Sequence, residues 1–357
     1  MTDDPIKSAE IDLPWLNRVL SEQLSNEITG YELQVIGEGV GVLGEIARLI
    51  LQLKDETTTT VICKFSAIID GTREFARDMG YYETELSFYQ SIARDMPVYV
   101  PFVYYQRMDM DTYRFVIVME DMVGIAGDQV SGCSTEQAVQ IVTELAKLHS
   151  HWNDPQQLDT LTWLRCINTP ELIRKGMAET ESSLPIYAER FPDLIPTWFD
   201  ELQRVYPDTL LKLANEFNSK PHTLVHGDYR LDNFIFPSEG STKTVAILDW
   251  QLAYRTMSSF DLGYFMFQSL DIELRRSQEN LLIDTYVAGR NEQGDRSVTF
   301  DSIKSELGAV ALYCYVYPIV GGALADLSKP RTRPLINAMS QRVIAAIEDY
   351  DSLRLLA

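Results

Sequence analysis

Strand-like apolar runs fill much of the first third of the chain. They cover residues 31–36, 45–53, 58–65, 98–106 and 113–119, and turn residues stand between several of them. Short apolar runs rich in β-branched residues and bounded by turns favour β-strands that pair with their neighbours. We therefore expect a small antiparallel sheet in this part of the chain.

Two stretches show the 3.6-residue period of a helix instead. Residues 14–24 place leucines and a valine on one face, which predicts a short N-terminal helix. Residues 73–93 predict one continuous helix, because their apolar positions follow one another at steps of four, three, four and three. These positions are Phe75, Met79, Tyr82, Leu86 and Tyr89.

After Gly124 the pattern becomes mostly helical. Ser134 and Gln137 have the spacing of a capping box at the start of an apolar helix. Two short β runs, 234–236 and 245–248, interrupt the helices around a polar loop, and helical patterns resume from Asp261. The chain thus predicts an α+β protein with a mostly β lobe over residues 1–123 and a mostly helical lobe over 124–357.

Composition and charge narrow the class of protein. A chain of 357 residues suits two lobes, and 45% hydrophobic with 23% charged residues excludes disorder as the main state. The 31 basic and 52 acidic side chains give a formal charge of −21, which argues against a nucleic-acid backbone or an anionic membrane as the main partner.

The cysteines and the N-terminus bear on the compartment. Four cysteines stand without a Cys-x-x-Cys pair, so we expect neither a structural zinc site nor a disulfide framework, and we expect a reducing compartment. The first residues are acidic, and no uninterrupted apolar run reaches the roughly 18 residues of a membrane helix. We expect a soluble cytoplasmic protein.

The densest polar cluster of the chain is a loop that ends in an amide. It reads His226-Gly-Asp228-Tyr-Arg-Leu-Asp232-Asn233, and Asp249 follows at the end of the next apolar run. Carboxylate and amide oxygens suit Mg²⁺, which binds one or two protein carboxylates together with phosphate oxygens. With a glycine-rich turn and a strand lysine upstream, this set is typical of phosphoryl transfer.

These residues resemble a known family. His226-Gly-Asp228, followed by Asn233 and Asp249, resembles the catalytic segment of the aminoglycoside-phosphotransferase-like branch of the protein-kinase-like fold. The details are similar to the ecdysteroid-kinase-like and choline-kinase-like group, as the motifs His-Gly-Asp-Tyr-Arg-Leu-Asp-Asn, Leu-Asp-Trp-Gln251 and Asp261-Leu-Gly-Tyr-Phe265 show. The resemblance spans nearly the whole chain, and it implies a bilobal protein-kinase-like fold that uses ATP and Mg²⁺.

The resemblance also implies roles for single residues of the polar cluster. Asp228 would be the catalytic aspartate, which accepts or orients the proton of the acceptor hydroxyl. Asn233 and Asp249 would hold the metal ions that bridge the phosphates of ATP. His226 would pack beneath the loop, and Asp261 would brace the loop through hydrogen bonds from the next helix.

The nucleotide side begins with a glycine-rich turn and a lysine. Gly37, Gly39 and Gly41 lie between two strand-like runs, where a backbone without Cβ atoms can approach phosphates. A glycine turn between strands is by itself more often a plain hairpin. Lys64 is a cation within an apolar strand, and a buried ammonium needs a partner. Its alternative is an edge position that points to water.

The partner of Lys64 should come from the helix that follows. Glu83 and Glu85 flank the apolar stripe on either side, so helix geometry alone does not choose between them. The Glu-x-x-Phe-Tyr pattern of the resembling family matches Glu85, which we therefore expect to pair with Lys64. The segment that holds Met119, Glu120 and Met122 resembles the strand-to-hinge segment whose backbone meets the adenine.

Three features argue for a small-molecule acceptor. Gly227 stands where many regulated protein kinases have an arginine, and Trp250 follows Asp249 where protein kinases have phenylalanine. Only eleven residues separate Asp249 from Asp261, without an Ala-Pro-Glu motif, so there is no room for a peptide-gripping segment. We expect ATP-dependent transfer to a hydroxyl of a small molecule.

The identity of that acceptor stays open. An aminoglycoside, a choline-like amine alcohol, a steroid or other lipophilic alcohol, and a hydroxyacyl thioester are all compatible with the resemblance. The competing class is a kinase-like protein without catalysis that binds a nucleotide, a ligand or a partner. The presence of Asp228, Asn233 and Asp249 favours the enzyme.

Three other polar or aromatic groups invite interpretation. His149 lies on an apolar helix stripe and His151 two residues on, so we expect a buried core histidine and no shared metal site. The aromatic run 313–317 could line a substrate pocket, but core packing is the favoured interpretation. The basic segment 329–333 is expected to be a solvated loop.

Overall fold

The computed structural model describes residues 4–36, 44–238 and 240–356. The chain forms two compact units. The first runs to Asp95 and then from Val100 to Val123, and the second consists of Met96–Tyr99 and the chain from Gly124 onward.

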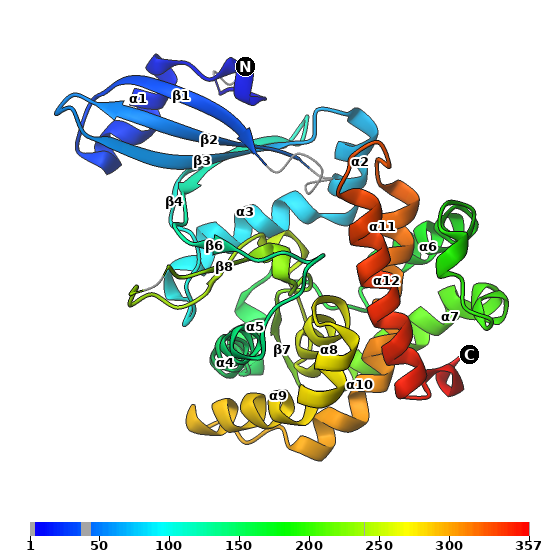
Figure 1. Ribbon diagram of the computed structural model, residues 1–357. Helices are drawn as coiled ribbons and strands as arrows, with labels where there is room; N and C mark the ends of the chain where they lie inside the picture. The colour runs from blue at the N-terminus through cyan, green and yellow to red at the C-terminus, as the bar shows by residue number, and fades with distance from the viewer. Residues whose placement is uncertain (1–3, 37–43, 239, 357) are drawn as a thin grey trace. The chain divides into compact units, whose positions relative to one another are not determined.

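The first unit is built on a five-stranded sheet in the order β1-β2-β3-β5-β4 (Figure 1). Every neighbouring pair in this sheet is antiparallel. The strands are β1 (Ile28–Ile36), β2 (Gly44–Leu53), β3 (Thr58–Ser66), β4 (Val103–Asp109) and β5 (Arg114–Glu120). The predicted antiparallel sheet is therefore present, with β5 and not β4 next to β3.

Helices cover both faces of this sheet. In α1 (Leu13–Leu24), Trp15, Leu16, Val19 and Leu20 are buried, and they share a core with Cys63 and Phe65 of β3. Because side chains alternate between the faces of a strand, Lys64 points to the opposite face. That face carries α3 (Tyr81–Ser91), whose Glu85 bonds Lys64. The core thus sets the direction of the one charged side chain in the middle of β3.

The helix expected over 73–93 is in fact two helices, α2 (Asp70–Met79) and α3. Gly80 adopts a left-handed conformation with φ 65°, and its N–H bonds the carbonyl of Arg77. Glycine tolerates this conformation and ends α2 in the manner of a helix C-cap. The apolar period continues across Gly80, which is why the pattern alone suggested one helix.

The strand expected over 98–106 begins only at Val103. Pro97 and Pro101 lack the N–H group that a ladder strand needs. Tyr99 makes an isolated bridge with Ala246 and belongs to the second unit.

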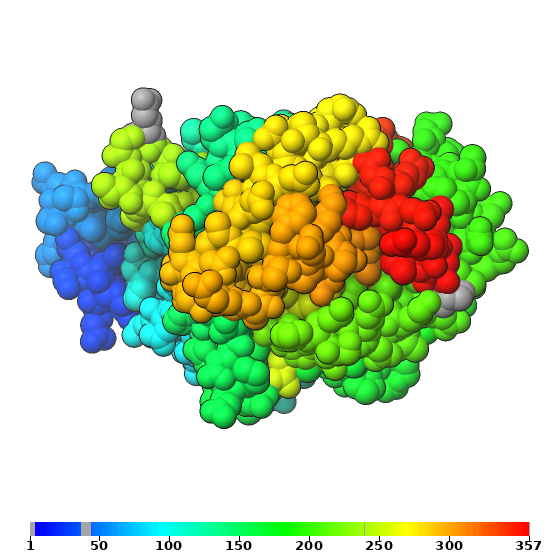
Figure 2. All heavy atoms as spheres, turned by 90° about the horizontal axis from the view of Figure 1, so that it is seen from below, coloured from blue at the N-terminus to red at the C-terminus, as the bar shows by residue number. Residues whose placement is uncertain are grey.

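The second unit is mostly helical. Its helices are α4 (Thr135–His151), α5 (Pro155–Thr160), α6 (Pro170–Arg190), α7 (Phe199–Asn218), α8 (Ser259–Ser269), α9 (Ile272–Glu292), α10 (Phe300–Cys314), α11 (Val316–Leu324) and α12 (Thr332–Asp349). The capping box of Ser134 and Gln137 is present at the start of α4, as predicted. Figure 2 shows α9 and α10 on one face of this unit, with the end of α12 beside α10. All eleven residues of α8 are buried.

Two small sheets interrupt these helices and place the polar loop. Strands β7 (His222–Val225) and β10 (Tyr254–Met257) pair antiparallel. Strands β6 (Ile125–Ala126), β8 (Phe234–Phe236) and β9 (Ala246–Ile247) form the other sheet. The polar loop 226–233 connects β7 to β8, so one strand of each sheet anchors it.

One apolar stretch passes a length and composition test for a membrane span. Among the described residues, an 18-residue window within Phe300–Leu324 has a mean hydropathy of 1.6, and 67% of this window is buried inside the protein. It comprises α10 and α11, which pack against α6, α8 and α12. Burial of this kind is what a core helix shows, and core helices pass the same test.

Candidate functional site

The polar loop begins with a glycine that its backbone requires. Gly227 has φ +81°, and a Cβ atom placed there would lie 2.1 Å from the carbonyl oxygen of Leu252. No residue with a side chain fits without moving the backbone of the segment after Asp249. The absence of an arginine before Asp228 therefore has a steric cause in this chain.

Asp261 braces the same loop from below. It lies in the first turn of α8 and is fully buried, and its two oxygens accept hydrogen bonds from the backbone N–H groups of His226 at 2.6 Å and Gly227 at 3.0 Å. A buried carboxylate needs such donors to offset its desolvation. The predicted bracing role of Asp261 is confirmed in its geometry.

His226 links the loop to the strand that precedes Asp249. Its Nδ1 accepts a hydrogen bond from the N–H of Asp228 at 3.2 Å, so Nε2 carries the proton and donates to the carbonyl of Leu248 at 2.8 Å. The ring is fully buried against Trp250, with 4.8 Å between ring centroids. His226 thus packs beneath the loop, as expected, and holds Asp228 and Asp249 on one framework.

The carboxylate of Asp228 is fixed by three donors from two elements. Tyr264 of α8 donates its hydroxyl to Oδ1 at 2.6 Å, and Asn233 donates Nδ2 to Oδ2 at 3.0 Å. The Nε atom of Arg230 lies 3.0 Å from Oδ1 and 3.1 Å from Oδ2. Burial would raise the pKa of Asp228, but the charge of Arg230 and the hydrogen bond from Tyr264 lower it below its ordinary value. Asp228 is therefore ionised at neutral pH.

Asn233 and Asp249 are brought together by strand pairing. Phe234 of β8 is opposite Ile247 of β9, and the N–H of Leu248 donates to the carbonyl of Asn233 at 2.8 Å. Asp249 follows directly, in a left-handed conformation with φ 62° that non-glycine residues rarely adopt. Such strain often marks a functional position, because neighbouring structure must hold it.

The two side chains fit a magnesium ion in their chemistry. Asn233 turns its Nδ2 toward the backbone oxygen of Asp228 at 2.8 Å, which leaves the amide oxygen Oδ1 available as a ligand. Asp249 is partly exposed and adds a carboxylate. Within the described residues, no group of three or more His, Cys, Asp and Glu side chains could hold a metal on its own. Mg²⁺ does not require one, because it keeps waters and phosphate oxygens among its ligands.

Charged residues around Asp228 form a ladder of alternating sign, which we call the charge ladder. It consists of Asp228, Arg230, Asp232, Arg331 and Asp128. Arg230 Nη1 bonds Asp232 at 3.1 Å, and Arg331 bonds both oxygens of Asp232, at 2.9 and 2.6 Å. Arg331 also reaches Asp128 at 2.7 Å.

The basic segment 329–333 is therefore more than the solvated loop we expected. Arg331, just before α12, turns inward to the side chain of Asp232, which is only 4% exposed. Burial alone would raise the pKa of Asp128, but hydrogen bonds from Ser131 and Arg331 lower it to about 2. Sequence spacing gave no signal for this pairing, since Arg331 lies 99 positions after Asp232.

The aromatic run 313–317 divides between core and site. Tyr315 is fully buried, which agrees with core packing. Tyr317 is partly exposed, donates to the carbonyl of Gly227 at 3.3 Å, and packs edge-on against Tyr264 with 4.7 Å between centroids. The pattern missed Tyr264 and Tyr317 as neighbours of Asp228. Tyr264 lies three residues after Asp261, and this helical spacing was the one available signal.

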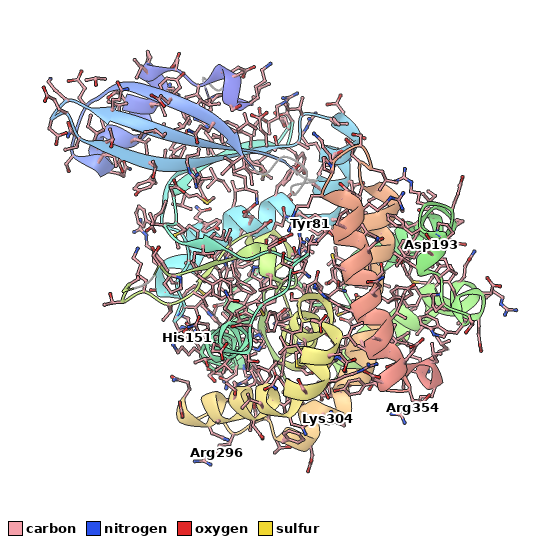
Figure 3. All side chains as sticks on the ribbon, in the orientation of Figure 1. Tyr81, His151, Asp193, Arg296, Lys304 and Arg354 are labelled. Carbon is pink, nitrogen blue, oxygen red and sulfur yellow. The ribbon has the colours of Figure 1, made fainter. Side chains whose placement is uncertain are left out.

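The two histidines of α4 behave as predicted. His149 is fully buried, between the hydroxyl of Tyr286 at 2.7 Å and Asp261 Oδ2 at 3.3 Å. His151 is exposed at the end of α4 (Figure 3). Burial lowers the pKa of His149, although Asp261 opposes this change. His149 is thus a neutral core residue that contacts the brace of the loop.

In the first unit, Lys64 and Glu85 form the expected pair. Lys64 Nζ lies 2.7 Å from Glu85 Oε1, and the side chains are 11% and 1% exposed. Their pairing is confirmed, whereas their contact with a nucleotide stays a prediction. Gly37, Gly39 and Gly41 lie outside the described residues.

The predicted hinge residues lie at the end of β5 and directly after it. Met119 and Glu120 end β5 opposite Ile62 and Val61. Arg48 of β2 clamps Asp121 with two hydrogen bonds, at 2.7 and 3.0 Å. Met122 is buried. The segment is thus held to the sheet, and its contact with adenine stays a prediction.

Comparison with solved structures finds the same fold in small-molecule kinases. Choline kinase from Cryptosporidium parvum Iowa II has a TM-score of 0.62 and 11% identity over 98% of both chains. Ethanolamine kinase from Plasmodium vivax has a TM-score of 0.54 and 15% identity over 93% of this chain and 85% of that one. A microcompartment-associated aminopropanol kinase has a TM-score of 0.52 and 16% identity over 97% of this chain and 99% of that one.

At these identities the likeness concerns the fold alone, and it confirms the predicted α+β, protein-kinase-like architecture. A search of curated proteins gave no match. The sequence profile of the ecdysteroid kinase-like family matches residues 41–292, which is well over half of the chain and includes Lys64, Asp228 and Asp249. This match agrees with the resemblance of the polar loop, and the chain belongs to the ecdysteroid kinase-like family.

Proposed function

We propose that the protein transfers the γ-phosphate of ATP to a hydroxyl group of a small molecule in the presence of Mg²⁺. The carboxylate of Asp228 carries this proposal. It is ionised and held at both oxygens by Arg230, Asn233 and Tyr264, so it is ready to accept a hydrogen bond from an acceptor. Family membership and the three solved kinases of the same fold support the same reaction class.

In the proposed reaction, Asp228 orients the acceptor hydroxyl and takes its proton. The hydroxyl oxygen forms a bond to the γ-phosphorus, the bond from that phosphorus to the β–γ bridging oxygen breaks, and ADP leaves. Asn233 Oδ1 and the Asp249 carboxylate would hold Mg²⁺. When bound, the ion neutralises charge on the phosphate oxygens. Gln251 Nε2 donates to Asp249 Oδ2 at 3.3 Å, which helps to orient that carboxylate before the nucleotide arrives.

The first unit would supply the nucleotide site. Lys64, kept charged and aimed by Glu85, would contact the α- and β-phosphates. Gly37, Gly39 and Gly41 would approach the phosphates through backbone N–H groups, and the backbone of Met119, Glu120 and Met122 would meet the adenine. Arg48 supports this last segment through Asp121.

The segment after Asp249 supports a small acceptor. Its eleven residues include a 3-10 turn (Trp250–Leu252) and β10, which pairs in register with β7 from Tyr254 opposite Val225 to Met257 opposite His222. Because these residues pair with β7, the segment contains no unpaired stretch long enough to bind a peptide. The names of the solved neighbours suggest amine alcohols and the family name suggests steroids, so both classes belong in the test.

The test combines binding and turnover. Mg²⁺-dependent thermal stabilisation by ATP should appear first. A panel of amine alcohols, aminoglycosides, steroid alcohols and hydroxyacyl thioesters is then scored for ADP release, with Asp228→Asn as the control. Acceptor-dependent ADP release that the control lacks supports the proposal. Nucleotide binding without release on any acceptor would favour the non-catalytic alternative.

A further inference from the structure

The charge ladder contains two residues, Arg331 and Asp232, to which the proposed reaction assigns no role. One guanidinium, that of Arg230, serves two carboxylates: Nε faces Asp228, and Nη1 faces Asp232 at 3.1 Å. The position of Arg230 therefore reflects a balance between two attractions. Any cation that pairs with Asp232 weakens its attraction for Arg230 and so shifts that balance.

The charge of Asp232 is neutralised mainly by Arg331, which lies far from it in the sequence. The side chain of Asp232 is 4% exposed, and it accepts two hydrogen bonds from Arg331 and one from the backbone N–H of Gln129 at 2.9 Å. A paired arginine fork on a buried carboxylate is among the strongest ion pairs in proteins. Without Arg331, Arg230 would be the one remaining cation of the ladder beside the buried charge of Asp232, with the N–H of Gln129 as a neutral donor.

The outer end of the charge ladder has a different character. Asp128 also contacts Arg331, but its side chain is 46% exposed, and water and salt weaken exposed pairs. The ladder is therefore stabilised mainly by its more buried ion pairs. These are Arg331 with Asp232, Arg230 with Asp232, and Arg230 with Asp228.

We propose that Arg331 and Asp232 are positioning residues for the catalytic carboxylate. By sharing the charge of Asp232, Arg331 limits the pull of Asp232 on Arg230 and keeps Arg230 on Asp228. The basic segment before α12 thereby sets the orientation of Asp228 without touching either substrate. This inference rests on the proposed function, because it assigns Asp228 as the group that orients the acceptor.

The main experiment replaces Arg331 and follows kcat and Mg·ATP affinity separately. In Arg331→Met, Arg230 should move toward Asp232, and kcat should fall on the order of ten- to a hundredfold, as for a misplaced catalytic group. Mg·ATP affinity should stay within about twofold, because Asp249 is not part of the ladder and Asn233 keeps its hydrogen bond to the backbone oxygen of Asp228. Arg331→Lys should recover part of kcat. The double variant Asp232→Asn/Arg331→Met should recover more activity than Arg331→Met alone, because it removes the pull of Asp232.

Arg333→Met is the matched control. Arg333 lies in the same segment, and its guanidinium donates to the carbonyl of Arg190 at 3.2 Å and stacks on Phe191. The control removes the same charge and a tertiary contact without touching the charge ladder, so kcat should be unchanged. An unchanged kcat in Arg331→Met, an equal fall in Arg333→Met, or a double variant as poor as Arg331→Met would overturn the proposal.

A second readout separates this inference from the proposed function. The free energy of unfolding is measured for Asp228→Asn and Arg331→Met, alone and combined. If the ladder couples the two positions, Asp228→Asn has a different effect on stability in the Arg331→Met background than in the wild type. Additive effects would refute the proposed coupling between Arg331 and Asp228, even if the enzyme is active. Coupled effects in a protein without turnover on any acceptor would refute only the proposed function.

Discussion

Lys64 of β3 and Glu85 of α3 form an ion pair of 2.7 Å in which both side chains are largely buried. The strand directs Lys64 away from the apolar core that faces α1, and the helix meets it with the only fully buried glutamate of α3 among the described residues. A buried ammonium without its carboxylate would be costly. The pair therefore fixes the direction of the lysine that we assign to the phosphates.

This pairing predicts that Glu85 and Glu83 differ in importance. Glu85→Gln should lower ATP turnover by about tenfold or more, because Lys64 loses the charge that aims it. Glu83→Gln, in the same helix with the same chemical change, should leave turnover within about twofold. The measurement is steady-state ADP release with a confirmed acceptor. Equal losses in the two variants, or a loss in Glu83→Gln alone, would refute this assignment.

Gly227 should tolerate no side chain. Gly227→Ala combines a left-handed φ with a Cβ contact of 2.1 Å to the oxygen of Leu252. Gly294 has the same φ, +81°, but no heavy atom within 4 Å of the position that its Cβ would occupy. Gly294→Ala should therefore cost about 1 kcal/mol for the backbone alone, and Gly227→Ala should cost about 1–3 kcal/mol more through overpacking. Chemical denaturation of both variants measures the difference. Equal stabilities would show that the loop relaxes freely.

His149 should make stability depend on pH. Because burial lowers its pKa in the folded chain, the unfolded chain binds a proton near the ordinary value of 6.5, where the folded chain does not. The contribution of His149 is therefore complete above pH 6.5 and is lost as the pH falls below that value. In His149→Gln, stability should fall less between pH 7.5 and pH 5 than in the wild type. Parallel curves from urea denaturation at each pH would contradict this expectation.

The sequence predicted those parts of the candidate site whose residues lie close together along the chain. Asp228, Asn233 and Asp249 stand within one loop and one short strand pair, so their proximity follows from chain connectivity and could be expected without a structure. Lys64 could be assigned because a charge within an apolar strand needs a partner. The choice of Glu85 came from the family resemblance.

Other features depend on contacts that no local pattern contains. The apolar period runs through Gly80, so only the backbone conformation shows that the helix ends there. Arg331 stands in a basic, turn-rich segment that has the composition of a surface loop, and only the tertiary fold turns it toward Asp232. Tyr317 looked like part of a core helix because the residues around it are apolar.

The two acidic residues of the site are assigned different functions. Asp249 is assigned to the metal, so Asp249→Asn should weaken Mg·ATP binding as well as turnover. Asp228 is assigned to the acceptor hydroxyl, so Asp228→Asn should keep Mg·ATP affinity and lose turnover by about 10²–10⁴-fold, the usual contribution of a positioned acid or base. Both changes are nearly isosteric, and circular dichroism should show both variants folded.

The measurement that tests this assignment most directly is calorimetric titration of Mg·ATP into both variants, beside ADP release with a confirmed acceptor. We predict tight Mg·ATP binding with little turnover for Asp228→Asn, and loss of both for Asp249→Asn. Full turnover in Asp228→Asn, or nucleotide binding that is lost in Asp228→Asn and kept in Asp249→Asn, would contradict the proposed roles.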